Sequence, residues 1–337
     1  MSIQVIRPGL LTTIQDSGRY GYQKYGVIAS GAMDLYSLRL ANILVGNHEN
    51  EAALEITLLG PALQLTENAL IAITGGDLSP TVNGQPLPLW RPIYVKKGCT
   101  IKFGACKTGC RAYLAVAGGY DIPEVMDSQS TYLRAGIGGY QGRALQAGDR
   151  LDLKPLQAGN DSLIQAFPHV QEDANFAAPS WYASQEHIRT AAVTTVRIMR
   201  GIQYEQFSAS SHEALWRECF QVTTQSDRMG YRLTGPSLQL AQPMEMISEA
   251  ITLGTIQVPP DGNPIILLAD RQTAGGYPKI GQVALVDVDK VAQVRPGGSI
   301  QFQEISVAEA EQLYLEREQT ISHLYTSIRL KLGLPFR

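Results

Sequence analysis

Polar side chains that could bind a small anion gather in glycine-broken loops of this 337-residue chain. The first loop, residues 15–24, holds Arg19, whose planar guanidinium matches a carboxylate or a phosphate. A second glycine-containing stretch, residues 30–34, ends at Asp34. Asp34 can act as a base, or it can cap the helix that the apolar spacing predicts directly after it. Arg19 is therefore a candidate anion-binding residue, and the role of Asp34 stays open.

Residues 225–232 form another polar loop, without helical or strand periodicity. One interpretation is a local ion pair between Asp227 and an arginine, which at a surface would stabilise the fold by only about 0–1 kcal/mol. The other is an anion-binding loop. In that case Asp227 is a base or an orienting group, and the ligand contacts come from Arg228, Tyr231 and Arg232.

The third polar region runs from residue 248 to residue 280. Within it, the apolar run at 265–268 predicts a buried strand that delivers polar residues into a glycine-broken loop, where binding sites are often found. A plain hairpin connection with solvated side chains is the alternative. The candidates for catalysis are Glu249, Asp270 and Lys279, and those for ligand binding are Gln257, Gln272, Thr273 and Tyr277.

Several well-known cofactor motifs are missing from the sequence. Residues 136–143 are glycine-rich, but they lack the spacing of a dinucleotide-binding loop, and residues 275–279 lack the spacing of a phosphate-binding loop. There is no G-x-S-x-G elbow and no Met-Lys-Met biotin-carrier motif. Cys106 and Cys110 have no second ligand pair nearby, so no metal site is expected.

The composition argues against several classes of partner. The net charge is −3, and no basic stripe alternates with aromatic residues, so nucleic-acid binding is not expected. No polybasic segment or long apolar run suggests membrane attachment, since a spanning helix needs about 20 apolar residues. The first nine residues lack the apolar core of a signal peptide, so we expect a cytoplasmic protein with reduced thiols.

Short β-strands must position most of these loops. In residues 1–154 and 193–305, short apolar runs alternate with turn-forming residues, which predicts two β units. Three partial sequence matches recur in the same order in the two halves and favour related units. The matching pairs are 5–9 with 198–201, 58–65 with 233–240, and 97–103 with 296–302.

Local signals predict the remaining elements. Asn83–Gly84 predicts a tight hairpin, and the loss of periodicity over residues 155–192 predicts a linker or crossover. Ser306 and Glu309 form a capping box that predicts the start of a C-terminal helix within residues 306–337. Its amphipathic pattern is explained either by docking on the core or by binding to a partner.

Six longer motifs occupy residues 8–16, 30–34, 41–47, 226–232, 254–260 and 275–280. Together they resemble the allophanate hydrolase subunit 2 family, which includes KipA and the C subunits of 5-oxoprolinases and is also called the biotin-dependent carboxyltransferase family. The match runs from about residue 3 to residue 303. The family often has threonine where this chain has Ala274, a departure inside the third polar region.

The resemblance implies a mainly β protein with a cyclophilin-like β-barrel. It also implies one subunit of a 5-oxoprolinase, whose partners are the A subunit of that enzyme and its KipI-like B subunit. The complex would use ATP to open the 5-oxoproline lactam to L-glutamate. One alternative is a carboxyltransferase module of the urea carboxylase type, which would use carboxybiotin. Another is an antagonist that binds KipI and thereby regulates a sporulation histidine kinase.

An enzyme subunit of this kind needs cations near developing phosphate charge and a group that orients or removes a proton. An antagonist would need neither, and its binding to the B subunit would survive loss of the cations. Under the enzyme hypothesis the charge comes from Arg228, Arg232 and Lys279, the base is Asp227, Asp270 or Glu249, and the ring amide is held by Gln257 and Gln272.

Overall fold

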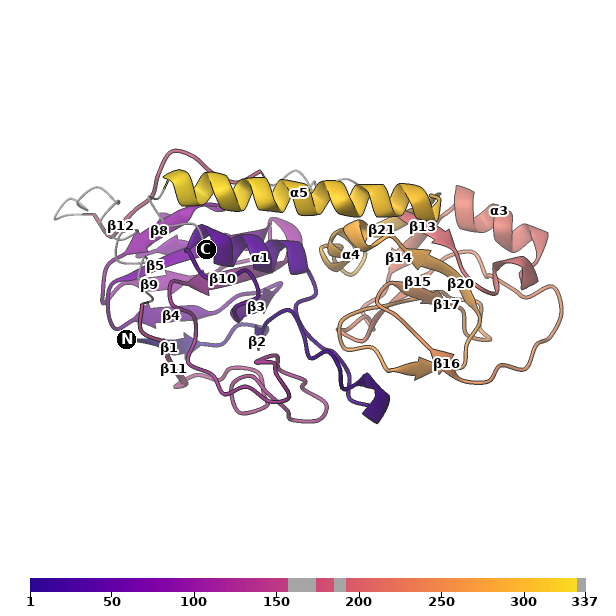
Figure 1. Ribbon diagram of the computed structural model, residues 1–337, viewed down its shortest axis with the longest axis horizontal. Coiled ribbons are helices and arrows are strands. Elements are labelled where there is room, and N and C mark those ends of the chain that lie inside the picture. The colour runs from indigo at the N-terminus through magenta and orange to yellow at the C-terminus, as the bar shows by residue number, and fades with distance from the viewer. Residues whose placement is uncertain (157–173, 185–191, 332–337) are drawn as a thin grey trace. The chain divides into compact units, whose positions relative to one another are not determined.

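The computed structural model describes residues 1–156, 174–184 and 192–331, which form two compact units (Figure 1). The first unit comprises residues 1–18, 34–189 and 319–337, and the second comprises residues 19–33 and 190–318.

One short segment belongs to a different unit from the residues next to it in the sequence. Residues 19–33 follow the first strands of the first unit in sequence but belong to the second unit. The division predicted from the strand and turn pattern places this segment in the first unit, residues 1–154. The boundaries of that predicted division stay a prediction. Most of the predicted linker at 155–192 lies outside the described residues.

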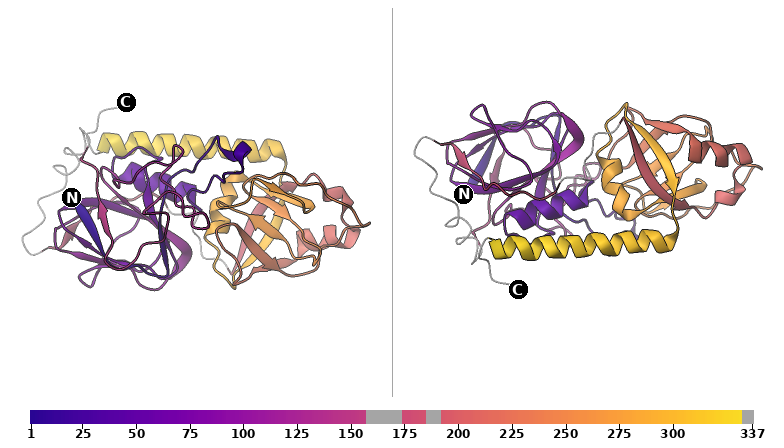
Figure 2. Two further views of the ribbon diagram at one scale, coloured as in Figure 1. Left: turned by 90° about the horizontal axis from the view of Figure 1, so that it is seen from below. Right: turned by 90° about the horizontal axis from the view of Figure 1, so that it is seen from above.

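Two six-stranded antiparallel sheets make up the first unit and share one apolar core (Figure 2). Alternate residues such as Ile3 and Val5, or Ile71 and Ile73, are fully buried in this core, as expected when one face of each strand points inward. The first sheet has the order β11 (Arg150–Asp152), β1 (Ser2–Arg7), β4 (Ala62–Leu65), β9 (Thr100–Lys102), β6 (Thr81–Val82) and β7 (Gln85–Pro86). The second has the order β12 (Phe176–Ala177), β8 (Pro92–Val95), β5 (Ala69–Asp77), β10 (Thr108–Val116), β3 (Ala53–Thr57) and β2 (Leu11–Gln15).

Two local predictions are confirmed in this unit. Helix α1 (Leu35–Leu44) begins after Asp34, whose carboxylate accepts hydrogen bonds from the backbone N–H and the hydroxyl of Ser37 at 2.9 and 2.6 Å. Asp34 thus caps the helix, which packs on strands β5 and β10. Asn83 and Gly84 both have left-handed φ angles, 47° and 87°, and form the tight turn between β6 and β7.

A closed seven-stranded barrel forms the second unit (Figure 1). Strands β13 and β21 run parallel, and every other neighbouring pair is antiparallel. The order around the barrel is β13 (Val193–Arg200), β20 (Lys279–Val283), β17 (Thr255–Gln257), β18 (Ile265–Leu267), β15 (Gly230–Thr234), β14 (Cys219–Val222) and β21 (Ser299–Glu304). The inward-facing side chains include Ile198, Phe220, Ile256, Ile280 and Ile300, all fully buried.

Short elements surround the barrel. A two-stranded ribbon pairs β16 (Glu249–Ala250) with β19 (Ala274–Gly275). The helical elements of this unit are η1 (Gln23–Tyr25), η2 (Tyr204–Gln206), α3 (Ala209–Arg217) and α4 (Leu285–Ala292).

Helix α5 (Val307–Lys331) starts in the second unit and ends in the first. The predicted capping box is present, since Ser306 and Glu309 exchange hydrogen bonds of 2.7 to 3.2 Å. On the second unit, Arg317 binds Asp289 at 2.6 Å. No helix in the described part of the chain is long and apolar enough to cross a membrane. The mainly β fold with two β units and a C-terminal helix is confirmed.

Candidate functional site

All the site residues predicted from the sequence lie in the second unit, but they do not gather at one place. Strand register separates them: Gln257 pairs with both Lys279 and Ile265, whereas Asp270 lies five residues beyond Ile265. The Asp270 N–H bonds to the Arg228 carbonyl, so Asp270 lies beyond the Gly230–Leu267 pair, whereas Ile265 pairs with Arg232 at the other end of the same ladder. The expectation that strand β18 and its following loop deliver Asp270 and Lys279 to one place therefore does not match the register.

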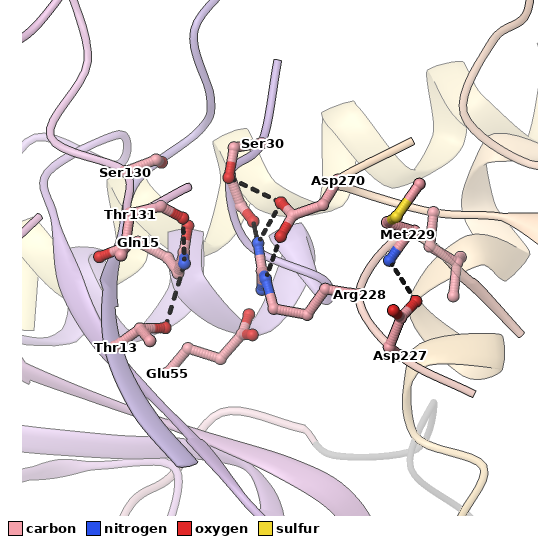
Figure 3. Close-up of polar contacts among 12 residues, drawn as sticks. Thr13, Gln15, Ser30, Glu55, Ser130, Thr131, Asp227, Arg228, Met229 and Asp270 are labelled. Atoms are coloured by element: carbon pink, nitrogen blue, oxygen red, sulfur yellow. Dashed lines mark hydrogen bonds and ion pairs between the residues drawn. The ribbon is translucent and has the colours of Figure 1, made fainter. Parts of the chain in front are cut away.

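At one end, Arg228 and Asp270 form a buried bidentate ion pair (Figure 3). Arg228 donates from Nε and Nη2 to the two carboxylate oxygens of Asp270, each at 3.0 Å. The pair extends the β15–β18 ladder, because the Asp270 N–H donates to the Arg228 carbonyl at 2.9 Å.

The same ion pair holds the 19–33 segment. Ser30 donates its hydroxyl to Asp270 at 2.7 Å, and Arg228 donates to the carbonyl oxygen of Gly31 at 2.5 Å. A guanidinium whose fork is occupied by a carboxylate and a carbonyl is suited to holding a loop. In this arrangement Arg228 and Asp270 act as a structural clamp on residues 30 and 31.

The other residues of the 225–232 loop are dispersed. Asp227 is exposed and accepts hydrogen bonds from the N–H groups of Met229 and Gly230, at 2.8 and 3.3 Å, so its carboxylate shapes its own turn. Tyr231 is buried in the barrel core and donates to the Ala292 carbonyl at 3.3 Å. Arg232, on the opposite face of strand β15, is exposed. The structure does not bring these three side chains together around one point.

At the other end, Lys279 and Glu249 form an ion pair between strand β20 and the ribbon. The Lys279 ammonium, only 6% exposed, donates to Glu249 at 2.7 Å. This hydrogen bond and the positive charge of Lys279 hold the pKa of Glu249 below its usual range. Gln203 is also part of the group. Its side-chain oxygen accepts from the Lys279 N–H at 3.1 Å, and its side chain helps to lower the pKa of Glu249.

Gln257 completes this group, because residues directly opposite in an antiparallel pair point to the same face of the sheet and Gln257 lies opposite Lys279. Its side-chain nitrogen is buried and has no hydrogen-bond partner among the described residues. Burying an amide N–H without a partner costs about 1–3 kcal/mol. We use the name Lys279 group for Gln203, Glu249, Gln257 and Lys279.

Gly275 brings the ribbon close to Gln257. A Cβ atom at Gly275 would lie 2.4 Å from the side-chain nitrogen of Gln257, nearer than real Cβ atoms come to another heavy atom. Gly275 also pairs with Glu249 in the ribbon, so its lack of a side chain lets Glu249 and Gln257 both lie next to strand β19.

Gly275→Ala is expected to push the Gln257 amide out of place and, under the enzyme hypothesis, to lower turnover by about tenfold, as misplacing a positioned donor does. Stability changes little, because the ribbon has only two residues in each strand. Steady-state kinetics and thermal melting check this, with Gly104→Ala in the first unit as the control, because a Cβ atom there meets only ordinary van der Waals contacts. Activity like that of the unchanged chain would contradict the role of Gly275.

A cavity of about 460 Å³ lies at the Lys279 end of the barrel. It is lined by residues 258–260 directly after β17 and by residues 276–278 directly before β20, including Tyr277. Its size is within the range of small-molecule sites, and most of its lining is apolar. Among the remaining predicted binding residues, Gln272 is exposed and Thr273 accepts a ribbon hydrogen bond from the Ile251 N–H at 3.2 Å.

The predicted anion-binding residue Arg19 belongs to the 19–33 segment of this unit. Arg19 is fully buried, and its N–H donates to the Ala29 carbonyl at 2.6 Å, which closes the base of the 19–33 loop. Ser30 and Gln203 were not predicted as site residues. Ser30 lies inside the sequence motif at residues 30–34. Gln203 lies in no motif, and no sequence signal marks it.

The first unit contains its own buried polar row, which sequence reasoning also missed. Thr13, Glu55 and Tyr113 lie opposite one another on strands β2, β3 and β10. The Tyr113 hydroxyl donates to Glu55 at 2.7 Å, and burial together with the Glu55 charge raises the pKa of Tyr113 well above its usual value. Tyr113 also accepts from the Asp34 N–H at 2.8 Å, so the row supports the start of helix α1.

Comparison with known proteins identifies the family. Residues 25–304 match the family model described as "Carboxyltransferase domain, subdomain A and B". The chain belongs to this family. It is 39% identical over 309 residues to the 5-oxoprolinase C subunit of Haemophilus influenzae, covering 91% of this chain and 92% of that protein. It is 36% identical to the 5-oxoprolinase C subunit of Escherichia coli, covering 91% of this chain and 93% of that protein.

Members of the family also occur inside longer chains. The chain is 35% identical to urea amidolyase of Saccharomyces cerevisiae over 96% of its own length but only 18% of that protein. Among solved structures, the urea amidolyase of K. lactis has a TM-score of 0.83 at 33% identity, with 96% of this chain and 20% of that chain covered. The protein TTHA0988 has a TM-score of 0.75 at 33% identity, with 90% and 55% covered.

Proposed function

We propose that this chain is the C subunit of an ATP-dependent 5-oxoprolinase and works with the A and B subunits to open 5-oxoproline to L-glutamate. The observation that carries the proposal is the end-to-end match to two proteins named as C subunits of 5-oxoprolinases, since about nine-tenths of each chain is covered. A chain that matches these two relatives over nearly their whole length suits the same kind of assembly.

The Lys279 group has the chemistry for a cyclic amide. The buried N–H of Gln257 donates a hydrogen bond to the lactam oxygen, which gives that N–H the partner that it lacks among the described residues. Lys279, held in place by Glu249 at 2.7 Å, stabilises negative charge that develops on the same oxygen when the ring opens. The small β16–β19 ribbon moves aside to admit the ring, as short two-stranded elements open at low cost.

ATP binding is assigned in this proposal to one of the other subunits. The triphosphate of ATP carries several negative charges and needs surplus positive charge around it. Two buried cations that the sequence offered for phosphate charge, Arg228 and Lys279, are each paired with a carboxylate. Phosphorylation of the lactam oxygen, which makes the ring nitrogen a better leaving group, then takes place where this chain meets the ATP-binding chain.

The test is reconstitution of the complex from this chain and the purified A and B subunits of the same organism. The proposal predicts 5-oxoproline-dependent ATP hydrolysis and glutamate release with all three proteins, and loss of glutamate release when this chain is left out. Undiminished turnover by the other two proteins alone would reject an essential role for this chain. The same preparation shows by co-purification whether this chain binds the B subunit.

A carboxyltransferase that uses carboxybiotin is the second candidate. It is favoured by the family description and by the structural match to urea amidolyase at a TM-score of 0.83. The two proposals differ in their small-molecule partner, so calorimetric titration of the complex with free biotin and with 5-oxoproline separates them. Binding of biotin without any 5-oxoproline-dependent ATP hydrolysis would select the carboxyltransferase.

A further inference from the structure

Arg271 differs from the other partly buried cations of the second unit. It directly follows Asp270 and is intermediate in exposure. Its Nη1 atom donates one long hydrogen bond, 3.4 Å, to the Leu268 carbonyl. Its Nε atom is buried and has no hydrogen-bond partner among the described residues.

The neighbouring cations show what is missing at Arg271. Arg197 binds Asp287 at 2.6 Å, Arg228 binds Asp270 at 3.0 Å, and Arg317 binds Asp289 at 2.6 Å. In the described ranges 1–156, 174–184 and 192–331, no carboxylate forms such a pair with Arg271. A cation that is partly withdrawn from water without a counter-charge is energetically costly, and an incoming anion removes that cost.

Two features of the surroundings of Arg271 favour an anion as its partner. Tyr20, in the loop held by the Arg228–Asp270 clamp, is 58% exposed and lies close enough to Arg271 to interact with its charge. Residues 17–33 contain no aspartate or glutamate, so this loop supplies no competing carboxylate. Burial lowers the pKa of Arg271, which is the direction expected of a cation without a counter-ion.

We propose that Arg271, together with the hydroxyl of Tyr20, forms an oxyanion-binding subsite for the carboxylate or a phosphate face of a small ligand. The terminal nitrogens of the guanidinium donate to two oxygens of the ligand, a pair of acceptors that carboxylates and phosphates share. This subsite does not depend on the 5-oxoprolinase activity and is separate from the Lys279 group.

Binding to the isolated, full-length protein tests the proposal. Inorganic phosphate, acetate and 5-oxoproline are titrated at constant ionic strength, and affinity is measured by calorimetry and by the rise in melting temperature that a ligand of the folded state causes. The unchanged chain is expected to bind at least one of them. Arg271→Gln weakens that binding about 10- to 100-fold, as loss of a charge-assisted contact does.

Three further variants sharpen the result. Arg271→Lys keeps the positive charge but loses the planar guanidinium with its several N–H donors, so binding falls by less than in Arg271→Gln. Tyr20→Phe weakens binding a few-fold. Arg217→Gln, at an arginine whose side chain is 75% exposed on helix α3, is the matched control and leaves binding unchanged. Binding of acetate and 5-oxoproline without phosphate identifies a carboxylate subsite, and the reverse identifies a phosphate subsite.

The proposal is overturned by either of two outcomes. One is that the unchanged chain binds none of the three anions. The other is that Arg271→Gln, which is checked for folding by circular dichroism, binds them as tightly as the unchanged chain. If Arg271→Gln does not fold, the Tyr20→Phe variant decides, because an exposed hydroxyl is removed without loss of a core contact; equal binding by that variant then rejects the subsite.

Discussion

Lys279→Met is expected to lower 5-oxoproline-dependent glutamate release by the reconstituted complex about 100- to 1000-fold, the usual effect of removing one donor that stabilises a developing oxyanion. Methionine fills nearly the same buried volume as the lysine stem, so packing next to Ile280 and Gln257 is kept. Glu249 loses its partner but is half exposed, and water solvates its carboxylate. The loss should therefore fall on turnover and leave folding nearly unchanged.

Two comparison variants isolate the charge of Lys279. Lys279→Arg keeps the cation but moves it, and should retain part of the activity. Lys97→Met, at an exposed lysine of the first unit, is the matched control and should behave like the unchanged chain. Measurements are kcat and KM for 5-oxoproline, with the other two proteins of the complex at fixed concentration. A Lys279→Met complex within about twofold of the unchanged complex would remove Lys279 from the proposed chemistry.

Asp270→Asn should destabilise the second unit by about 3–5 kcal/mol, because removing one partner of a buried ion pair leaves the other charge without compensation. Arg228 and Asp270 have side chains only 6% and 7% exposed. The substitution also weakens the hydrogen bond from Ser30 to residue 270, so the 19–33 loop loses part of its attachment. Urea denaturation measures the free energy of unfolding, and limited proteolysis reports release of the loop.

The exposed pair between Arg200 and Glu304 supplies the matched control. Its atoms approach to 2.7 Å, but both side chains are about half exposed, so Glu304→Gln should cost no more than about 1 kcal/mol. The double variant Arg228→Met with Asp270→Asn should be more stable than Asp270→Asn alone, since no unpaired charge remains buried. Equal costs for Asp270→Asn and Glu304→Gln would show that the clamp is not important for stability.

The two predictions give the two ends of the barrel different roles: one end stabilises a loop, and the other carries the proposed chemistry. The Arg228–Asp270 end holds a loop through an ion pair whose donors and acceptors are occupied. The Lys279 end combines an ammonium, a carboxylate and an amide N–H that lacks a partner among the described residues. A buried donor without a protein partner can donate a hydrogen bond to a ligand or to an ordered water. For that reason the proposed chemistry is placed at Lys279, although both ends were candidates from the sequence.

The elements that the sequence predicted well depend on residues close together in the chain. The cap of Asp34 on Ser37, the Asn83–Gly84 turn and the Ser306–Glu309 capping box each involve at most four consecutive residues, so local geometry alone selects them. The two β units follow from period-two burial, which is local as well. The sequence motifs indicated the family, and the family resemblance led to the expectation of a β-barrel.

The arrangement of the site depended instead on contacts between residues far apart in the chain. Arg228 meets Asp270 across 42 residues, Lys279 meets Glu249 across 30, and Gln203 meets Lys279 across 76. The sequence alone determined which residue types were available and that strands would carry them. Only the tertiary structure decided which cation faces which carboxylate, because barrel closure and strand register fix the end at which each side chain lies, and register is a property of pairs of strands and not of either sequence segment alone.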